Sequence, residues 1–384
     1  MLPLIPAAVL TAATLLLATL WRLALLALRR PAAGFWGRTL RWHLGLLVVH
    51  LFVTVPVALG IALPHLAGTR PDESGYGGPR LAADGTWQLQ SRESLQAETG
   101  EPGEGDAGAA CEESPFAVSF VAEDGVRLRG FLVPPAEAAH APRFVAVLVH
   151  GLFRGALELE TPASMLRDLG GEVLLVELRS HGGSQRARLT LGRDEALDVE
   201  AAVAFLRGRP GAEARPLVVF AVSLGTAAAA LAAPRIDGLD GLVLDAPMDD
   251  AASTARRVLG AGGPWSSIRE PWATTLLLSA RFLGGVPLGG VQPEDALRRL
   301  PADVAVLLVG AGRDRRMPPE NVRALYEALP TPPGRKRLWV EPGASHGKVW
   351  VSAPGEYRRH LAWLVERAAG PAAHDAGGAE TGGE

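Results

Sequence analysis

Two long runs of apolar side chains occupy the first part of the chain. Residues 2–20 are almost wholly apolar, and residues 44–63 form a second such run without a charged side chain. A helix of about 20 apolar residues spans the ~30 Å hydrocarbon layer of a membrane. The pattern therefore predicts a transmembrane hairpin over residues 1–66, with spans at about 2–21 and 44–63.

The connection between the two apolar runs carries basic charges and no acidic one. They are Arg22, Arg29, Arg30, Arg38 and Arg41. The positive-inside rule places such a connection in the cytoplasm, so everything after Leu63 is expected on the periplasmic or extracellular side. A cleaved signal peptide is the alternative, but no basic residue precedes the first run and no clear small-x-small cleavage site follows it. We therefore expect a protein of the inner or plasma membrane, held in the bilayer through residues 2–63.

The composition changes to Gly, Pro, Ser, Asp and Glu over residues 67–113, where no helical or strand periodicity is visible. Such a segment has too little apolar area to offset the entropy lost on ordering. A flexible acidic tether is predicted there, with a short ordered island at Trp87 and Leu89. A disordered tail is predicted over residues 370–384.

Strand-like and helix-like patterns alternate from residue 114 to residue 369. Strands are expected at 116–121, 126–133, 144–149, 173–178, 217–222, 241–244, 304–309 and 337–340. The first two are expected to form a hairpin at Asp124-Gly125, a dipeptide that favours tight turns. Helices are expected at 195–206, 224–233, 320–329 and 356–368. Continuous apolar strands separated by helices predict an α/β fold with a mostly parallel sheet and helices on both faces.

The strand-to-helix junction at Ser223 carries the strongest chemical signal. An apolar strand over 217–222 stops at this serine, and small helix formers begin at Leu224. Such a junction is typical of a nucleophile elbow, a strained turn that exposes the serine Oγ and requires small residues two before and two after it. Those positions hold Ala221 and Gly225. An ordinary N-cap of the following helix is the alternative role for this serine.

An acid and a histidine follow the last two expected strands. Ligands bind at the carboxyl ends of the strands in a parallel sheet, which is where Ser223 lies. Asp314 and His346 follow later strands and reach the same edge. The chain order Ser, Asp, His is the one expected of an α/β-hydrolase. Asp245 or Asp249, after an earlier strand, is an alternative acid.

The order of these motifs resembles the α/β-hydrolase superfamily over essentially all of residues 114–369. The matching segments are 149–155, 177–184, 221–225, 244–247, 312–314 and 343–346. The segment 190–198 is similar to that of prokaryotic membrane-associated hydrolases related to serine aminopeptidases and dienelactone hydrolases. Ala221 and Ser180 stand where many relatives have glycine, but neither change removes a reactive group.

The resemblance implies a Ser-His-Asp triad and an acyl-enzyme. Ser223 would attack the carbonyl, His346 would accept its proton and later protonate the leaving group, and Asp314 would hold the histidine tautomer. The resemblance also implies an oxyanion hole formed by the backbone N–H groups of Leu152 and Leu224.

Composition and charge restrict the other possible functions. The formal net charge of -3 gives no basic face for nucleic acid, and no phosphate-binding Gly-Lys-Ser or Gly-Lys-Thr loop is present. Cys111 is the single cysteine, so an intramolecular disulfide is impossible, and no spacing indicates a zinc or iron-sulfur site. We expect no cofactor, no metal and no nucleic-acid partner. His150 and His181 are expected to order loops and not to react or bind metal.

Residues 250–300 replace a simple crossover between strands and are expected to form a small cap over the cleft. Taken together, the patterns predict a membrane-anchored serine hydrolase that cleaves a carboxylic ester of a small molecule or a lipid. Peptidase, thioesterase and lipase activity are alternatives within the same fold. A non-catalytic, hydrolase-like binding module at the cell envelope is the alternative of a different class.

Overall fold

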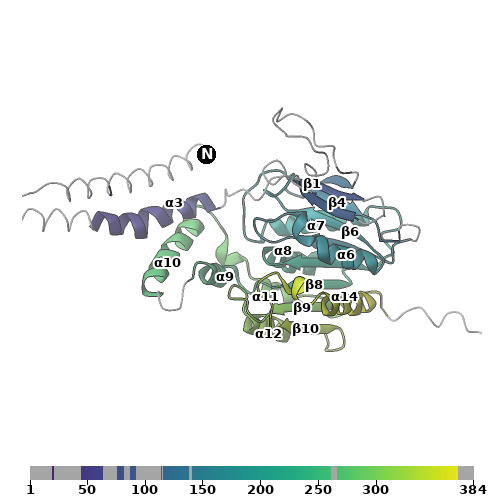
Figure 1. Cartoon of the computed structure of the whole chain (residues 1–384). Helices are drawn as coiled ribbons and strands as arrows, with labels where there is room; N and C mark the ends of the chain where they lie inside the picture. Colours follow the sequence, from purple (N-terminus) through teal and green to yellow (C-terminus); the bar gives the residue numbers. More distant parts are fainter. Residues whose placement is uncertain are drawn as a thin grey trace, which may run out of the picture. The chain divides into compact units, whose positions relative to one another are not determined.

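The chain divides into two compact units, which are described separately. The computed structural model describes residues 45–63, 76–81, 87–91, 116–137, 141–260 and 266–370, with Leu20 and Ser114. The first unit comprises residues 1–66, 188–191 and 251–291, and the second comprises 67–187, 192–250 and 292–384 (Figure 1). Apart from Leu20 and Gly370, the first predicted span and the predicted tail lie outside the described residues.

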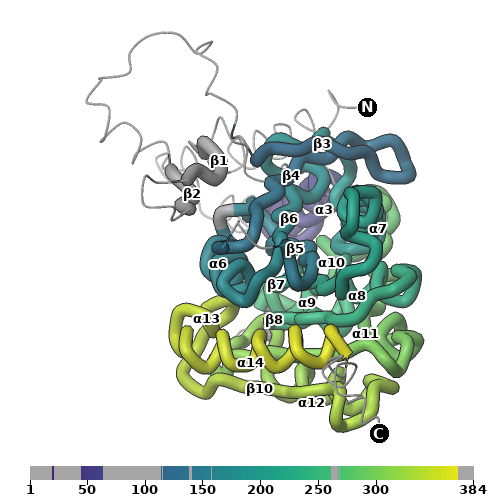
Figure 2. Tube along the Cα trace, turned by 90° about the vertical axis from the view of Figure 1, so that its right-hand side faces the viewer, coloured from purple at the N-terminus to yellow at the C-terminus, as the bar shows by residue number. Residues whose placement is uncertain are grey.

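An eight-stranded sheet forms the centre of the second unit. Its strands are β3 (Ala117–Val121), β4 (Arg127–Val133), β5 (Phe144–Val149), β6 (Gly171–Glu177), β7 (Leu217–Val222), β8 (Gly241–Asp245), β9 (Ala305–Ala311) and β10 (Lys336–Glu341). They pair in the order β10-β9-β8-β7-β5-β6-β4-β3, which Figure 2 shows from the bottom of the view to the top. The six strands from β10 to β6 are parallel, and β4 is antiparallel to both of its neighbours. The expected mostly parallel sheet is confirmed.

Helices cover both faces of this sheet. One face carries α7 (Glu195–Arg207), α8 (Leu224–Ala232), α11 (Pro293–Leu297) and α12 (Pro319–Ala328). The other carries α6 (Glu160–Asp168), α13 (Val349–Ser352) and α14 (Pro354–Ala368). Figure 2 shows α6 and α13 on the left of the strands and α7, α8 and α11 on the right.

The central strands are buried on both faces, which explains their unbroken apolar sequence. In β5, Val145 and Val147 pack with the α7 and α8 side, while Ala146 and Leu148 pack with the α6 and α14 side. Complete burial of one such aliphatic side chain contributes about 1.5–3 kcal/mol. The sheet is therefore a rigid support for the loops that follow its strands.

The predicted hairpin is confirmed at β3 and β4. These strands pair in register from Val121 opposite Arg127. Gly125 in the turn has a φ of +82°. A side chain would be strained in that conformation, which is why the Asp-Gly dipeptide predicts the turn correctly.

The predicted tether is not without regular structure. Strands β1 (Tyr76–Leu81) and β2 (Trp87–Ser91) form an antiparallel pair, with Leu81 opposite Trp87. The ordered island expected at Trp87 and Leu89 is part of this pair. Short strands with Gly and Pro give no clear alternation, so the sequence pattern did not predict β1.

The described residues of the first unit are mostly helical. The unit contains a π-helical turn over His50–Thr54, followed by α3 (Val55–Ala62), then α9 (Ala251–Val258), α10 (Ser266–Phe282) and a 3-10 turn over Leu288–Gly290. The sequence pattern predicts that residues 250–300 form a cap within the hydrolase domain. In the structure, residues 251–291 belong instead to the unit that contains α3.

The reason for this association is a close contact between α3 and α10. A Cβ atom on Gly60 would lie 2.6 Å from the backbone oxygen of Leu276 and 2.7 Å from the nitrogen of Ala280. A Cβ atom on Gly284 would lie 2.5 Å from the backbone oxygen of Gly60. The absent side chains let the two backbones touch, as small residues do between membrane helices.

One helix in the described part of the chain is long and apolar enough to cross a membrane. It covers Gly45–Ala62 and has a mean hydropathy of 2.3, and 28% of its residues are buried. The large apolar side chains it leaves exposed are Leu46, Val48, Val49, Leu51, Val53 and Leu59. This helix coincides with the second predicted span, at residues 44–63.

Candidate active site

The turn at Ser223 has the geometry that the sequence pattern predicts. Ser223 lies between β7 and α8 with φ 54° and ψ -122°. Its backbone N–H donates a 3.0 Å hydrogen bond to the backbone carbonyl oxygen of Asp245, at the end of β8. A non-glycine residue with positive φ costs about 1–3 kcal/mol and persists only where its surroundings hold it. The strain occurs at the one residue whose Oγ must project from the turn.

The small residues on either side of the serine are required by close contacts. A Cβ atom on Gly225 would lie 2.6 Å from the His150 oxygen and 2.7 Å from the Val149 oxygen. Ala221 is fully buried in β7, where it pairs with Val149 of β5. The methyl group of alanine is accommodated at this first position, whereas the second position has no room for one.

The structure brings together the three residues predicted for the triad. His346 Nε2 lies 2.8 Å from Ser223 Oγ, and His346 Nδ1 lies 2.6 Å from Asp314 Oδ2. Ser223 makes no side-chain hydrogen bond to the start of α8, so the alternative role as an N-cap is not what the geometry shows. The contacts form one continuous chain from hydroxyl to imidazole to carboxylate.

The carboxylate of Asp314 is held in its ionised form. Burial opposes ionisation, but the hydrogen bond and the charge of His346, with the N–H groups of Met317 and Arg316, outweigh it, and the pKa of Asp314 lies below its ordinary value. Both N–H groups donate to Oδ1, at 3.0 and 2.8 Å. Oδ2 is thereby left for His346.

The two alternative acids lie in other contacts. Asp245 is fully buried, and its Oδ2 accepts a 2.8 Å hydrogen bond from the Tyr357 hydroxyl. Asp249 accepts a hydrogen bond from the Asn321 amide. Neither is bonded to His346 in the structure, whereas Asp314 is.

Two neutral histidines fix the loop that follows β5. His150 Nε2 accepts the Leu178 N–H at 3.1 Å, and its Nδ1 donates to the Gly151 oxygen at 2.7 Å. His181 Nε2 accepts the Phe153 N–H at 3.2 Å, and its Nδ1 donates to the Arg179 oxygen at 2.9 Å. These partners place the single proton of each ring on Nδ1.

Burial keeps both rings uncharged. Burial, with the neighbouring His181, lowers the pKa of His150 to about 3. Burial also lowers the pKa of His181. The rings lie 4.8 Å apart. Their hydrogen bonds match the loop-ordering role expected for these two histidines.

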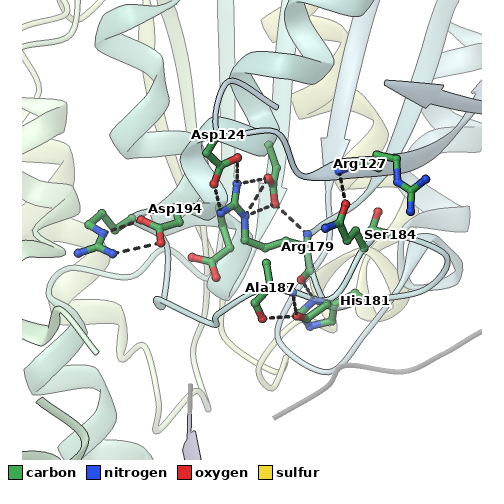
Figure 3. Close-up of polar contacts among 12 residues, drawn as sticks. Asp124, Arg127, Arg179, His181, Ser184, Ala187 and Asp194 are labelled. Atoms are coloured by element: carbon green, nitrogen blue, oxygen red, sulfur yellow. Dashed lines mark hydrogen bonds and ion pairs between the residues drawn. The ribbon is translucent and has the colours of Figure 1, made fainter. Parts of the chain in front are cut away.

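A buried ion pair anchors the loop that carries His181. Arg179 contacts Asp198 of α7 at 2.7 Å and Asp124 of the β3–β4 turn at 2.7 Å (Figure 3). The Arg179 and Asp198 side chains are only 2% and 0% exposed. A buried pair of this kind is destabilising to break, because the remaining charge has no partner. Two separate segments, α7 and the β3–β4 turn, therefore hold the loop after β6 in place.

The two N–H groups predicted for the oxyanion hole have different positions in the fold. Leu152 lies on the loop after β5 and lines the cavity at Ser223, and Leu224 is the first residue of α8. Within the described residues, neither backbone N–H donates a hydrogen bond. The first N–H groups of a helix have no partner inside the helix and attract negative charge.

Glu158 is a site residue that the sequence pattern did not reveal. Its Oε2 accepts the Gly151 N–H at 2.7 Å, and its Oε1 lies 3.7 Å from Arg154 Nε. Burial raises the pKa of its carboxyl above the ordinary value, against the opposing effects of these partners. It lies on a 3-10 turn, Ala156–Leu159, and no motif distinguishes it from the other acids of the chain.

Ser223, His346 and Asp314 line a cavity of about 770 Å³ in the second unit. Its apolar wall includes Val222 and Trp350. A cavity of this volume suits a small organic ligand. Among the described residues, no group of three or more His, Cys, Asp or Glu side chains is placed to hold a metal ion.

Comparisons with known proteins agree with this architecture. Residues 146–360 match the model of the alpha/beta hydrolase family. The uncharacterized protein YfhR of Escherichia coli strain K12 is 24% identical over 263 residues, covering 67% of this chain and 83% of that protein.

Two solved structures share the fold. The Pyrococcus furiosus esterase superposes with a TM-score of 0.52 at 21% identity, over 66% of this chain and 91% of the esterase. An alpha/beta hydrolase from Penicillium sp. sh18 gives a TM-score of 0.52 at 18% identity, over 66% of this chain and 98% of that one. The sheet order, the elbow and the matched residues together show that this chain belongs to the alpha/beta hydrolase family.

Proposed function

We propose that the protein is a serine hydrolase that cleaves carboxylic esters, with Ser223 as nucleophile, His346 as general base and acid, and Asp314 as the residue that orients His346. The observation that carries this proposal is the hydrogen-bonded chain from Ser223 Oγ to His346 to Asp314, at 2.8 and 2.6 Å. Both distances are within the reach needed for proton transfer and for tautomer control.

The reaction proceeds in two halves. Ser223 Oγ attacks the ester carbonyl while its proton passes to His346 Nε2, and the tetrahedral intermediate then expels the alcohol, which takes that proton. The acyl group remains on Oγ. Water attacks this acyl-enzyme, its proton passes to His346, and the carboxylic acid leaves as Oγ regains its proton.

The negative charge of each tetrahedral intermediate needs donors that are already in place. The N–H groups of Leu152 and Leu224 have no other partner in the described residues and are assigned to this role. One donor of this kind is worth about 2.7–4 kcal/mol of transition-state stabilisation. The bonds from His181 and Glu158 to the Phe153 and Gly151 N–H groups hold the loop around Leu152.

Ester hydrolysis is favoured over a non-catalytic binding role by the strain at Ser223. A binding module has no need of a serine held at φ 54° with its Oγ against an imidazole. The esterase from Pyrococcus furiosus has the same fold and supports the choice of ester over amide chemistry. Peptidase, thioesterase and lipase activity use the same residues and differ in the substrate.

Hydrolysis of 4-nitrophenyl hexanoate by the purified full chain tests the proposal. We expect Ser223→Ala to lower kcat/KM by about 10³-fold or more, and Asp314→Asn to lower kcat by about 10³–10⁴-fold, because the tautomer control is lost. Ser352→Ala, an exposed serine on α13, is the matched control. Ester turnover that survives Ser223→Ala at the parent rate would contradict the assignment.

We further propose that the protein is anchored in a membrane. The helix over Gly45–Ala62 supports this by its length, its hydropathy and its exposed apolar side chains. In the same unit, Leu278 of α10 is 51% exposed, Phe282 is 71% exposed and Leu283 is 62% exposed. Apolar surface on this scale is unusual in contact with water and suits contact with lipid.

A further inference from the structure

The cavity at Ser223 is surrounded by basic side chains. Three loops that follow strands of the sheet contribute them: the loop after β5, the loop after β9 and the loop after β10. They are Arg154, Arg313, Arg315, Arg316 and Lys348. All five side chains are exposed. The whole chain has a formal net charge of -3, so this grouping is not a reflection of a generally basic protein.

Three of these cations are in no direct contact with an acidic side chain of the described residues, although Lys348 is near enough to Glu158 for its charge to act to lower the pKa of that carboxyl. Within the described residues, the side chains of Arg313, Arg315 and Lys348 take part in no hydrogen bond or ion pair. Some exposed arginines elsewhere in the second unit have carboxylate partners, while others, such as Arg299 and Arg323, have none among the described residues. The pairs include Arg193 with Asp194, Arg235 with Glu200, and Arg298 with Glu294.

The acids in the cavity wall are already engaged. Asp314 is bonded to His346. Glu158 accepts the Gly151 N–H and lies 3.7 Å from Arg154. Glu177 is fully buried and accepts the Gly183 N–H at 2.7 Å, and burial raises its pKa to about 7. The wall therefore presents a surplus of positive charge to whatever enters.

We propose that the ester substrate carries an anionic group, a carboxylate or a phosphate, which Arg313, Arg315 and Lys348 bind at the mouth of the cavity while Ser223 attacks the ester carbonyl. A cleft lined by charge of one sign concentrates ligands of the opposite sign and raises their rate of capture about 10- to 10³-fold. Guanidinium groups bind carboxylate and phosphate through paired N–H donors, which adds geometric selection to the charge.

This inference rests on the proposed esterase function and names its class of substrate. The reaction itself is unchanged: the anionic group is not a participant, and it is released with the acid or with the alcohol. Two sources of such an ester share this chemistry, a soluble metabolite and an anionic lipid. The experiment has an arm for each.

The soluble arm compares esters of equal size that differ in charge. The neutral ester is 4-nitrophenyl hexanoate. The anionic esters are mono-4-nitrophenyl adipate, charged on the acyl side, and 5-hexanoyloxy-2-nitrobenzoate, charged on the leaving-group side. We expect at least one anionic ester to exceed the neutral one in kcat/KM by about tenfold or more at low salt, and this advantage to shrink in ~0.5 M NaCl because exposed charges are screened.

The lipid arm compares two mixed micelles, one that contains phosphatidylglycerol and one that contains phosphatidylcholine, and the two lipids have the same acyl chains. Release of fatty acid is measured for each. A preference of about tenfold for phosphatidylglycerol identifies a lipid as the source, and a preference seen in the soluble arm alone identifies a soluble ester. No preference in either arm, with the neutral ester still hydrolysed through Ser223, overturns the inference.

Charge reversal connects the preference to the named side chains. Arg313→Glu with Arg315→Glu, and separately Lys348→Glu, are expected to lower the ratio of kcat/KM between anionic and neutral esters by about tenfold or more. Arg358→Glu, at an exposed arginine of α14 outside the cavity, is the matched control and retains the ratio. The ratio is internal to each variant, so a general loss of activity does not imitate the effect.

The outcomes separate the two proposals. If no ester is hydrolysed in a manner that depends on Ser223, the proposed function fails. If hydrolysis depends on Ser223 but the ratio is the same in the parent and in both charge-reversed variants, only the anionic substrate class fails.

Discussion

Ser223 is held in a strained conformation by contacts on both sides of it. Its backbone N–H donates to the backbone carbonyl oxygen of Asp245, at the end of β8. Its own oxygen accepts hydrogen bonds from the Thr226 N–H and hydroxyl, at 2.9 and 2.5 Å. The same Thr226 hydroxyl oxygen accepts the Met248 N–H at 2.9 Å. The strain is therefore balanced by bonds to the neighbouring strand and to the loop after it.

Asp245, whose backbone oxygen accepts the Ser223 N–H, is one of the residues whose titration the fold changes strongly. It is fully buried, Oδ1 has no hydrogen-bond partner, and burial raises the pKa of its carboxyl to about 7. In the unfolded chain the same carboxyl ionises near 3.8. Between these two values the unfolded state is ionised while the folded state keeps the proton. The group therefore makes the fold progressively less stable as the pH rises through this window, and the loss is complete above about pH 7.

We predict that Asp245→Asn removes this dependence. The free energy of unfolding of the variant, minus that of the parent, is expected to rise by about 1–3 kcal/mol between pH 5 and pH 8. Chemical denaturation at several pH values measures it. A constant difference across that range would show that the carboxyl is ionised in the folded protein throughout.

The residues that sequence reasoning could find are those with a fixed position relative to a strand end. Ser223, Asp314 and His346 each follow a strand of the parallel part of the sheet, and parallel strands bring such positions to one edge. Glu158 could not be found in this way, because it does not have a fixed position relative to a strand end. It lies on a short 3-10 turn, and its hydrogen bond with the Gly151 N–H depends on the path of that turn. The pairing of Asp245 with Tyr357 depends in the same way on how α14 packs against the sheet.

At the level of elements, the buried strands were the most predictable. β5 and β7 begin and end at the expected residues, since they are apolar without a break and are bounded by polar or small residues. Helices α6, α9 and α10 were not expected. α6 contains Pro162, and α10 contains Pro271 within its run, so both sequences lack the uninterrupted periodicity that identifies a helix.

The helix over Gly45–Ala62 supports a prediction about membrane binding. Most of the full chain is expected to remain in the membrane pellet after extraction with alkaline carbonate. Replacement of Leu51 and Val53 by arginine puts two charges into the apolar helix, at a cost of about 2.5–3.5 kcal/mol each near the membrane centre. Combined with the same change at Leu16 and Leu17 of the first predicted span, it is expected to shift the protein to the supernatant. Fractionation followed by immunoblotting measures the distribution.

Val121→Arg is the matched control for this experiment. Val121 is also apolar and 59% exposed, but it belongs to β3 of the sheet unit. The variant is expected to stay in the pellet with the parent. A parent protein that carbonate extracts completely would contradict membrane anchoring by this helix.

At the scale of the whole molecule, the two units expose different kinds of surface, one apolar and one basic. The first unit exposes aliphatic and aromatic side chains along α10 and along the helix over Gly45–Ala62. The second unit surrounds the cavity at Ser223 with basic side chains. The division of residues 251–291 from the hydrolase unit could not be read from the sequence, because it depends on the close approach of Gly60 to α10.

Covalent labelling shows whether Ser223 is a nucleophile activated by His346. The full chain is treated with a fluorophosphonate probe, and the labelled peptide is identified by mass spectrometry. We expect one adduct, on Ser223, its absence in Ser223→Ala, and labelling slowed by about 10³-fold or more in His346→Ala. Labelling that persists in Ser223→Ala at the parent rate, on another residue, would contradict the role of Ser223 as the nucleophile.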